Sequence, residues 1–286
     1  MQNLEFETLR KLIDEELKCA VPAILKEDNL IGEAMNYGLT TGGKRIRGVL
    51  TVAFCDRMCV PRAQSLPFAV ALEMIHAYSL VHDDMPEMDN DDFRRGMPSC
   101  HKKYGPAIAL LAGDGILIGA VEYLLSRKDY YKSGPFLNAM SILLRSSGAS
   151  GMLGGQVLDM QAEQRKISLE ELCELHRMKT GALLLAPAEI AGALAEENSL
   201  DYCAYCKHIG LAFQIKDDLL DVEGNAEVLG KAVGKDQEEN KSTFVSLLGA
   251  SKAKEYLKKE IDGAVSYAKD DTFLLWLANY IATREK

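Results

Sequence analysis

Apolar residues recur at three- and four-residue intervals along nearly the whole chain, and this spacing constrains the fold more than any other feature. The pattern runs through 4–19, 44–58, 66–85, 105–127, 135–147, 170–195, 199–222, 251–268 and 272–282. Such spacing places the apolar side chains on one face of a helix. Segments with the alternation of a half-buried strand are missing from the sequence. The sequence therefore predicts an all-α protein.

The length and composition favour one large domain. The chain has 286 residues, of which 48% are hydrophobic, and it contains no linker rich in Gly, Ser or Pro. We therefore expect a single domain over residues 1–286, folded as a large helical bundle. The formal charge of −9 argues against nucleic acid as a partner, because nucleic-acid binders usually carry a basic face.

The sequence predicts a cytoplasmic protein. The first residues lack the basic and apolar regions of a secretory signal, and no uncharged run reaches the roughly 18 residues of a membrane span. Seven cysteines, an odd number, fit a reducing compartment. Cys203 and Cys206 have the spacing of a redox or zinc pair, but they lack a second pair, so we interpret them as packing residues.

A first cluster of acidic residues follows an apolar helical stretch. Asp83, Asp84 and Asp89 would repel one another unless a cation lay between them, and Mg²⁺ prefers such oxygen ligands. Pro86 should break the helix, which allows the chain to bring Asp89 back towards Asp83. His76 lies seven residues before Asp83 and so shares its helix face.

A second acidic cluster lies about half the chain away. Asp217 or Asp218 and Asp221 share a helix face with Gln214. Stacked carboxylates destabilise a helix by a few tenths of a kcal/mol unless a cation relieves the repulsion. We expect the two clusters to face each other across a cavity, with metal ions between them.

Two further stretches combine glycines with cations. In Gly42-Gly43-Lys44-Arg45-Ile-Arg47, the sequence predicts a helix start with Lys44 and Arg47 one turn apart on one face, which is either an anion site or a solvated first turn. In Lys179-Thr180-Gly181, a cation and a hydroxyl occur in mid-helix, although a lysine there more often extends to the surface.

The sequence leaves open the role of one polar pair and the effect of one proline. Gln156 and Asp159 form a polar pair amid apolar neighbours, either structural or lining the cavity. Pro187 should kink or end the long helix that contains it.

Together these motifs resemble the trans (E-type) polyprenyl diphosphate synthases, specifically the short-chain bacterial farnesyl diphosphate synthase-like group. The resemblance also covers Leu111-Ala-Gly-Asp114, Gly154-Gly155-Gln156-Val-Leu-Asp159 and the C-terminal ten residues. It implies a bundle around a deep central cavity (the isoprenoid synthase type I fold), usually a homodimer. It also implies Mg²⁺-assisted condensation of isopentenyl diphosphate with dimethylallyl or geranyl diphosphate, giving farnesyl diphosphate.

The resemblance assigns roles to residues of both clusters and of the basic stretches. Three Mg²⁺ ions would be held by Asp83, Asp84, Asp89, Asp217, Asp218 and Asp221. Isopentenyl diphosphate would lie on Gly43, Lys44, Arg47, His76 and Arg95. The residues that would bind the allylic diphosphate and stabilise the carbocation are Arg94, Lys179, Thr180, Gln214 and Lys231. Of these, the catalytic residues would be Lys179, Thr180 and Gln214. Tyr78 and Ser79 would limit product length, and the aromatic Tyr78 is similar to enzymes that stop at fifteen carbons.

The sequence departs from the family pattern at two positions and leaves alternatives open. Gly48 replaces the usual proline, which would loosen that helix start, and Glu87 occupies a position that is more often small. Residues 223–241 and 284–286 are candidates for closing the cavity. The alternatives are a geranyl or geranylgeranyl diphosphate synthase, a class I terpene cyclase, and a non-catalytic synthase subunit. The intact second aspartate cluster argues against the last two.

Overall fold

The computed structural model describes residues 2–25, 29–223 and 241–284, and these group into two compact units. The N-terminal unit comprises Leu4–Ala139 and Ile190–Glu197. The C-terminal unit comprises Met1–Asn3, Met140–Glu189 and Asn198–Lys286. The expectation of a single domain stays a prediction.

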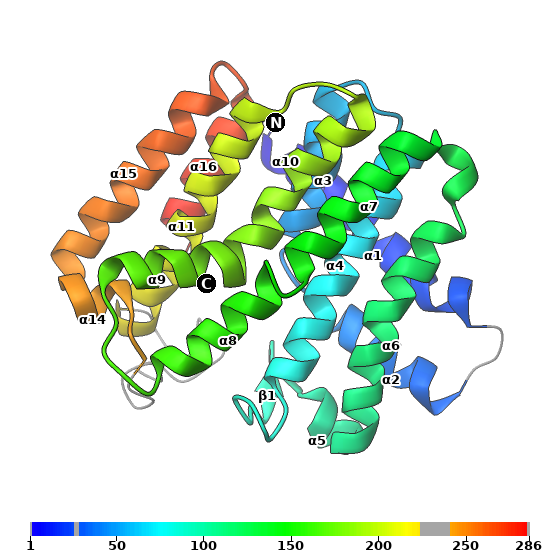
Figure 1. Ribbon diagram of the computed structural model, residues 1–286, viewed down its shortest axis with the longest axis horizontal. Helices are drawn as coiled ribbons and strands as arrows, with labels where there is room; N and C mark the ends of the chain where they lie inside the picture. The colour runs from blue at the N-terminus through cyan, green and yellow to red at the C-terminus, as the bar shows by residue number, and fades with distance from the viewer. Residues whose placement is uncertain (1, 26–28, 224–240, 285–286) are drawn as a thin grey trace. The chain divides into compact units, whose positions relative to one another are not determined.

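The N-terminal unit is built from helices and one small hairpin (Figure 1). Its elements are α1 (Gln2–Ile24), α2 (Leu30–Thr40), α3 (Ile46–Arg57), α4 (Arg62–Asp83), β1 (Phe93–Arg94), β2 (Met97–Pro98), α5 (Cys100–Tyr104), α6 (Pro106–Leu125), a 3-10 turn (Lys128–Tyr130) and the first half of α7 (Ser133–Ser147). Helix α4 packs against α3 and α6, and α2 packs against α6. The end of α4, where the first aspartate cluster begins, is therefore held by its neighbours.

The C-terminal unit continues the helical pattern. Its elements are the end of α7, α8 (Met152–Ala162), α9 (Leu169–His176), a π-helical segment (Arg177–Gly181), the first part of α10 (Ala182–Ala195), α11 (Leu200–Glu223), α14 (Phe244–Leu248), α15 (Ala250–Ala268) and α16 (Thr272–Thr283). Helix α11 packs against α15, α16 and the π-helical segment. The Tyr205 hydroxyl of α11 donates a hydrogen bond to the Leu274 carbonyl oxygen of α16 (2.8 Å).

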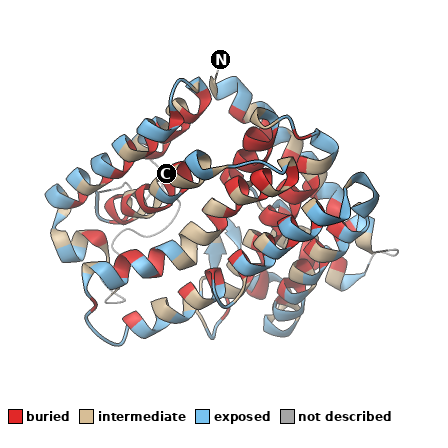
Figure 2. Ribbon diagram, turned by 45° about the horizontal axis from the view of Figure 1, so that its top comes forward, coloured by how far each residue is buried: buried red, intermediate tan, exposed pale blue. Residues whose placement is uncertain are grey.

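The apolar periodicity explains how these helices pack. In α1, Phe6, Leu9, Ile13, Leu17 and Ala20 are buried at three- and four-residue intervals, so one face of the helix meets the core. The alternation of buried and exposed faces is visible along the helices in Figure 2. The all-α prediction is confirmed for the described residues.

Some local predictions need correction. Helices α2 and α8 lie outside the predicted stretches, and α4 begins at Arg62, so Pro67 lies inside the helix instead of at its start. Helix α10 continues past Pro187, so this proline does not end the helix, and the alternative of a kink there stays a prediction. The β1–β2 hairpin was missed; Arg95 and Gly96 have φ of 55° and 78°, as a two-residue type I′ turn requires.

Two helices are long and apolar enough to cross a membrane by length and composition alone. They are Pro106–Leu125, which is α6, and the continuous stretch Leu169–Ala195. Core helices pass the same test, and more than half of the second window is buried within the protein. Helix α6 exposes Asp114 and Glu122, and carboxylates on a lipid-facing side are costly. The composition of these helices therefore gives only weak support to a membrane span.

Candidate active site

The first aspartate cluster begins at the C-terminal end of α4. The helix ends at Asp83, with Asp84 as its C-cap, and Pro86 follows directly in the turn. The backbone N–H of Asp89 donates a hydrogen bond to the Asp83 carbonyl oxygen (2.9 Å). The predicted break at Pro86 and the return of Asp89 towards Asp83 are confirmed.

Arg94 of β1 holds the buried Asp84. Its Nε donates to Asp84 Oδ1 at 2.9 Å, and its Nη2 contacts the same oxygen. Arg94 Nη2 also lies 3.6 Å from Asp91. Desolvation raises the pKa of Asp84, while Arg94 opposes that shift. The hairpin therefore places the positively charged guanidinium group of Arg94 beside the aspartate cluster.

Arg95 lies against the glycine loop that precedes α3. Its Nη1 contacts the Gly42 carbonyl oxygen, and a Cβ added at Gly43 would come within 2.9 Å of the same nitrogen. Gly43 has φ of 145°, a conformation that residues with side chains rarely adopt. Glycine at this position therefore permits the close approach of Arg95.

The partly buried imidazole of His76 lies within the electrostatic influence of several arginines. Burial lowers its pKa well below the usual value, and the positive charges of Arg47, Arg95, Arg45 and Arg94 lower it further. The imidazole is therefore neutral near pH 7. Arg47 and Arg95 therefore lie close enough to His76 to act on its charge, and their shared diphosphate site, which the family resemblance implies, stays a prediction.

The start of α3 differs from the prediction because of Arg45. The helix begins one residue after Arg45, which adopts a left-handed conformation with φ of 53°. Lys44 therefore lies in the preceding loop, and the prediction that it shares a helix face with Arg47 was wrong. Arg45 is buried; it donates to Asp14 Oδ1 (2.8 Å) and to the Leu39 carbonyl oxygen (2.7 Å). Its role is structural.

Gly48 joins α3 to α4 through a buried carboxylate. Its backbone N–H donates to Glu73 Oε1 (2.9 Å), and Arg45 Nη1 lies 3.6 Å from Glu73 Oε2. Proline has no N–H to donate. The departure from the family's usual proline therefore supplies a hydrogen bond that fastens this helix start.

The second aspartate cluster lies near the end of α11, and its members have different surroundings. Asp217 is partly exposed, and its Oδ1 lies 2.8 Å from Nη2 of the buried Arg284. Asp218 is buried; its Oδ2 accepts the Phe244 N–H (2.7 Å), and its Oδ1 accepts from Gln214 Nε2 (3.2 Å). Both oxygens of Asp218 therefore have partners, and the bond from Phe244 fastens the start of α14 to α11. Asp221 is buried as well.

The predicted catalytic residues Lys179 and Thr180 lie in the π-helical segment. π-helical turns occur frequently at functional sites. The Thr180 hydroxyl donates to Gln214 Oε1 (3.3 Å), and Lys179 Nζ contacts Asp159 of α8. A Cβ at Gly155 would come within 2.1 Å of the Lys179 backbone nitrogen, so that glycine permits α8 to pack closely here.

The candidate length-determining residues lie in the last turns of α4. Tyr78 is buried, and its hydroxyl has no hydrogen-bond partner within the described ranges. Desolvation, and then the charge of Asp83, raise its pKa to about 12. The Ser79 hydroxyl donates to the carbonyl oxygen of His76 in the same helix (2.9 Å). Lys231 lies outside the described residues.

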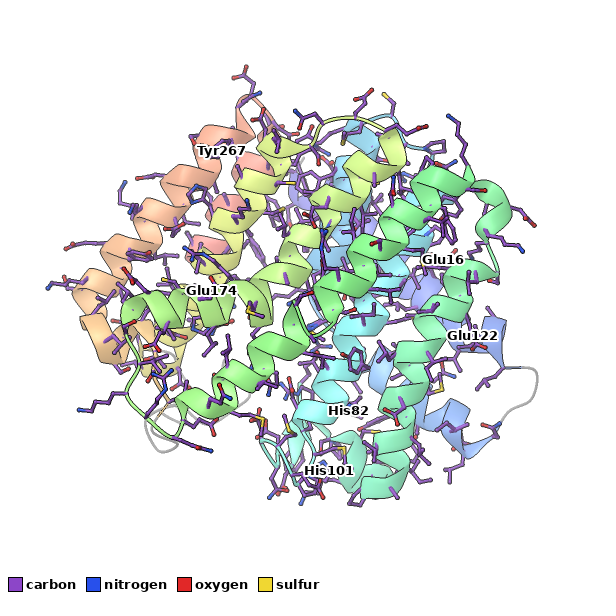
Figure 3. All side chains as sticks on the ribbon, viewed as in Figure 1. Glu16, His82, His101, Glu122, Glu174 and Tyr267 are labelled. Carbon is purple, nitrogen blue, oxygen red and sulfur yellow. The ribbon has the colours of Figure 1, made fainter. Side chains whose placement is uncertain are left out.

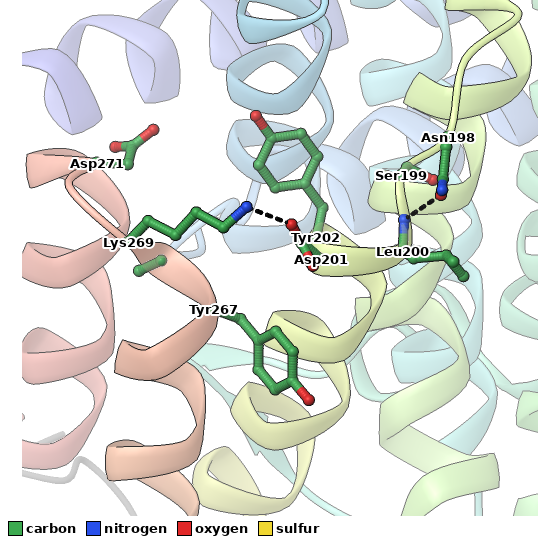
Figure 4. Close-up of a pocket in the computed structure, with 9 residues that line it drawn as sticks. Asn198, Ser199, Leu200, Asp201, Tyr202, Tyr267, Lys269 and Asp271 are labelled. Carbon is green, nitrogen blue, oxygen red and sulfur yellow. Dashed lines mark hydrogen bonds and ion pairs between the residues drawn. The ribbon is translucent and has the colours of Figure 1, made fainter.

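The aspartates of the two clusters differ in how closely they approach other metal-ligating side chains. Among the residues that it describes, no group of three or more His, Cys, Asp or Glu side chains is placed to hold a metal ion. A pocket of about 20 Å³ adjoins Asp84, Arg94 and Arg95. Larger pockets lie elsewhere, including one of about 480 Å³ at the start of α11, where Lys269 contacts Asp201 (Figure 4). None of the residues that line that larger pocket belongs to the predicted site.

Comparison with known proteins agrees with these features. The polyprenyl synthetase family matches residues 28–272. The farnesyl diphosphate synthase of Micrococcus luteus is 42% identical over 261 residues, 89% of each protein. Large subunit 1 of the chloroplastic heterodimeric geranylgeranyl pyrophosphate synthase of Arabidopsis thaliana is 40% identical over 97% of this chain and 78% of its own length.

A solved structure shares the fold over the full length. A geranyltransferase from Legionella pneumophila has a TM-score of 0.89 at 32% identity, covering 100% of this chain and 97% of that one. The predictions of the family and of a prenyl-transferring enzyme are thereby confirmed. The chain belongs to the polyprenyl synthetase family of prenyltransferases.

Proposed function

We propose that this chain joins isopentenyl diphosphate to dimethylallyl or geranyl diphosphate and forms (2E,6E)-farnesyl diphosphate. The observation that carries the proposal lies in the N-terminal unit. There, arginines gather around the neutral His76, and Arg94 reaches the aspartate cluster at the end of α4. The similarity to the farnesyl diphosphate synthase of Micrococcus luteus supports the fifteen-carbon product.

The basic residues of the N-terminal unit suit the diphosphate of isopentenyl diphosphate. Arg47 and Arg95 offer guanidinium groups that bind phosphate oxygens in pairs. The neutral imidazole of His76 adds an N–H donor, and Lys44 in the Gly43 loop adds a further cation. Together these side chains neutralise and orient the non-allylic substrate.

The aspartates suit Mg²⁺, and we propose three ions. The residues that would hold them are Asp83, Asp84 and Asp89 in the N-terminal unit, and Asp217, Asp218 and Asp221 in the C-terminal unit. Carboxylate oxygens are the ligands that Mg²⁺ prefers, and Asp83 and Asp89 remain partly exposed. Bound Mg²⁺ supplies electrostatic stabilisation of the negative charge on the departing diphosphate. Within the second cluster Asp217 is the strongest candidate ligand, because both oxygens of Asp218 accept hydrogen bonds from the protein.

The C-terminal unit supplies groups that suit the allylic substrate. Condensation breaks the bond between the allylic carbon and diphosphate, forms a carbon–carbon bond, and releases a proton. In this proposal, Lys179, with Arg94 and Lys231, neutralises the leaving diphosphate. Thr180 and Gln214, joined at 3.3 Å, direct their dipoles at the carbocation. The released diphosphate accepts the proton, and exclusion of water protects the cation.

A substrate-matched assay tests this function. Purified chain, Mg²⁺ and isopentenyl diphosphate are incubated with dimethylallyl, geranyl or farnesyl diphosphate, and product length is read by chromatography. Farnesyl diphosphate from the first two substrates and little elongation of the third support the proposal. A ten-carbon or twenty-carbon product indicates a geranyl or geranylgeranyl diphosphate synthase instead, and no product in any mixture indicates a non-catalytic subunit.

We also propose a homodimer, formed through α6. This helix exposes 45–61% of Leu110, Leu111, Ile118 and Leu125, and their spacing places them along one side. An exposed apolar stripe typically marks an interface. Ile118→Glu should convert the dimer to a monomer, as measured by light scattering; a dimer that persists contradicts this interface.

The proposed location is the cytoplasm, and the proposed organisation is a single domain without a membrane span. All seven cysteines are free thiols in the structure, as in a reducing compartment. The proposed partners are the small-molecule diphosphates and a second copy of the chain, without nucleic acid.

A further inference from the structure

The side chain of His82 connects the end of α4 to the backbone of α6. Its Nε2 lies 3.1 Å from the carbonyl oxygen of Leu110. A carbonyl oxygen can only accept, so the imidazole carries its proton on Nε2 and donates it. Figure 3 labels His82 near the C-terminal end of α4. His82 is the residue directly before Asp83 and Asp84.

Gly113 provides the space that this ring occupies. A Cβ added at Gly113 would come within 2.1 Å of His82 Nε2 and 2.3 Å of Cδ2. Contacts this short do not occur, so any larger residue would displace the imidazole. Asp114 Oδ1 lies 3.9 Å from the same nitrogen. The motif Leu111-Ala-Gly-Asp114, which the proposed reaction leaves without a role, therefore forms the seat of His82.

The same ring also contacts the residue proposed to limit product length. Tyr78 lies one turn earlier in α4, and its ring meets the imidazole edge-on with centroids 5.7 Å apart. The imidazole is therefore held by a hydrogen bond to α6, by the glycine surface and by the Tyr78 ring. These three contacts fix the rotation of the last turn of α4 about the helix axis. That rotation sets the direction of the carboxylates of the next two residues.

We propose that His82 is a positioning residue that orients Asp83 and Asp84 for metal and diphosphate binding, with Leu110 and Gly113 of α6 as its seat. The inference rests on the proposed function of the aspartate cluster. In this proposal the hydrogen bond acts through backbone geometry, and His82 is a ligand of neither substrate nor metal. Groups that orient metal ligands typically contribute a factor of about 10–100 in metal affinity or activity.

Two substitutions separate the hydrogen bond from the packing of the ring. His82→Gln keeps an N–H donor of similar reach, whereas His82→Phe keeps a ring and removes the donor. Binding of inorganic diphosphate in the presence of Mg²⁺ is measured by calorimetry, alongside kcat and the Mg²⁺ concentration for half-maximal activity. His82→Phe should weaken diphosphate binding about 10-fold or more, and His82→Gln should restore most of it. Equal binding by the two variants overturns the proposal.

A double-mutant cycle tests the seat independently. Gly113→Ala should weaken diphosphate binding in the native chain but have little further effect in a His82→Ala background, where the ring is gone. An equal effect of Gly113→Ala in both backgrounds overturns the proposal. The matched control is His208→Phe, which removes the bond to Glu260 (2.7 Å) in the C-terminal unit. It should lower the thermal midpoint without changing diphosphate binding.

The outcomes for the two proposals are distinguishable. A native chain that fails to condense the substrates refutes the proposed function. A native chain that is active, with diphosphate binding unchanged by His82→Phe, refutes only the role of His82.

Discussion

Asp217 and Asp218 are neighbours in sequence, but their substitution by Asn should affect different properties. Asp218→Asn should mainly lower thermal stability, whereas Asp217→Asn should mainly lower activity. Asp218 is buried, and its two oxygens accept from Phe244 N–H and Gln214 Nε2. Asparagine offers one acceptor oxygen and no charge, so one donor loses its partner and the other bond weakens. A hydrogen bond to a charged group contributes about 1.5–3 kcal/mol and a neutral one about 1 kcal/mol. The expected loss for Asp218→Asn is therefore about 2–4 kcal/mol.

That loss corresponds to a measurable change in thermal stability. At about 2 °C per kcal/mol for a chain of this size, the unfolding midpoint of Asp218→Asn should fall by about 4–8 °C. Asp217→Asn keeps an acceptor oxygen for the buried Arg284 but loses the charge, so a charged bond becomes a neutral one at a cost of about 0.5–2 kcal/mol. Its midpoint should fall by about 1–4 °C, less than that of Asp218→Asn, while kcat/KM falls by about 100-fold or more if the residue binds metal opposite the leaving group.

The assay is differential scanning calorimetry of both variants, paired with steady-state kinetics over a range of Mg²⁺ concentrations. Below the unfolding midpoints, Asp217→Asn should raise the required Mg²⁺ concentration more than Asp218→Asn does, because Asp217 is the stronger candidate ligand of the second cluster. The reasoning is refuted if Asp217→Asn loses as much stability as Asp218→Asn, or if Asp218→Asn unfolds at the native temperature.

Gly48→Pro should lower the unfolding midpoint by about 1–5 °C, because the lost bond to Glu73 (about 1.5–3 kcal/mol) outweighs the roughly 0.4–1 kcal/mol that proline contributes by stiffening the unfolded chain. Gly48→Ala keeps the N–H but places a Cβ 3.0 Å from Ile13 and 3.1 Å from Glu73, so it measures the steric part of the change; a midpoint for proline no lower than that for alanine contradicts this role. Tyr78→Ala should shift products towards twenty carbons or longer, and an unchanged chromatographic profile would remove Tyr78 as the length-limiting residue. Burial lowers the pKa of His176 to about 4, so its contribution to stability is full above pH 6.5 and is lost as the pH falls, by about 3 kcal/mol at pH 4. His176→Phe, which keeps the stacking on Phe244, should unfold less readily in acid than the native chain; equal acid sensitivity in urea titrations would contradict this.

Features with local causes were predicted well from the sequence. The break at Pro86 and the return of Asp89 follow from the missing N–H of proline, and the structure confirms both. Apolar periodicity located most of the helices, because each must bury one face. The positive charges of Arg47 and Arg95 reach His76, and their common role in binding diphosphate, which the family resemblance implies, stays a prediction.

Features with tertiary causes were not visible in the sequence. The left-handed backbone of Arg45 places Lys44 outside α3, and it depends on a partner, Asp14, in a distant helix. The structural bonds of Asp218 involve Phe244, which lies beyond a long connection. The need for glycine at position 113 comes from the His82 ring, which belongs to another helix and packs against it. A single sequence carries no signal for such contacts.

The two aspartate clusters belong to different compact units, and their joint action on one diphosphate is part of the proposed function. Asp83→Asn and Asp217→Asn each remove a carboxylate from one cluster. If both clusters act on the same leaving diphosphate, either change alone should reduce turnover strongly.

The most direct test of the central claim is the product formed by the native chain. With Mg²⁺, isopentenyl diphosphate and dimethylallyl diphosphate, the account predicts farnesyl diphosphate as the main product, through geranyl diphosphate as an intermediate. Removal of Mg²⁺ by a chelator should abolish product formation, and adding Mg²⁺ back should restore it. Failure to consume either substrate in the presence of Mg²⁺ would contradict the account.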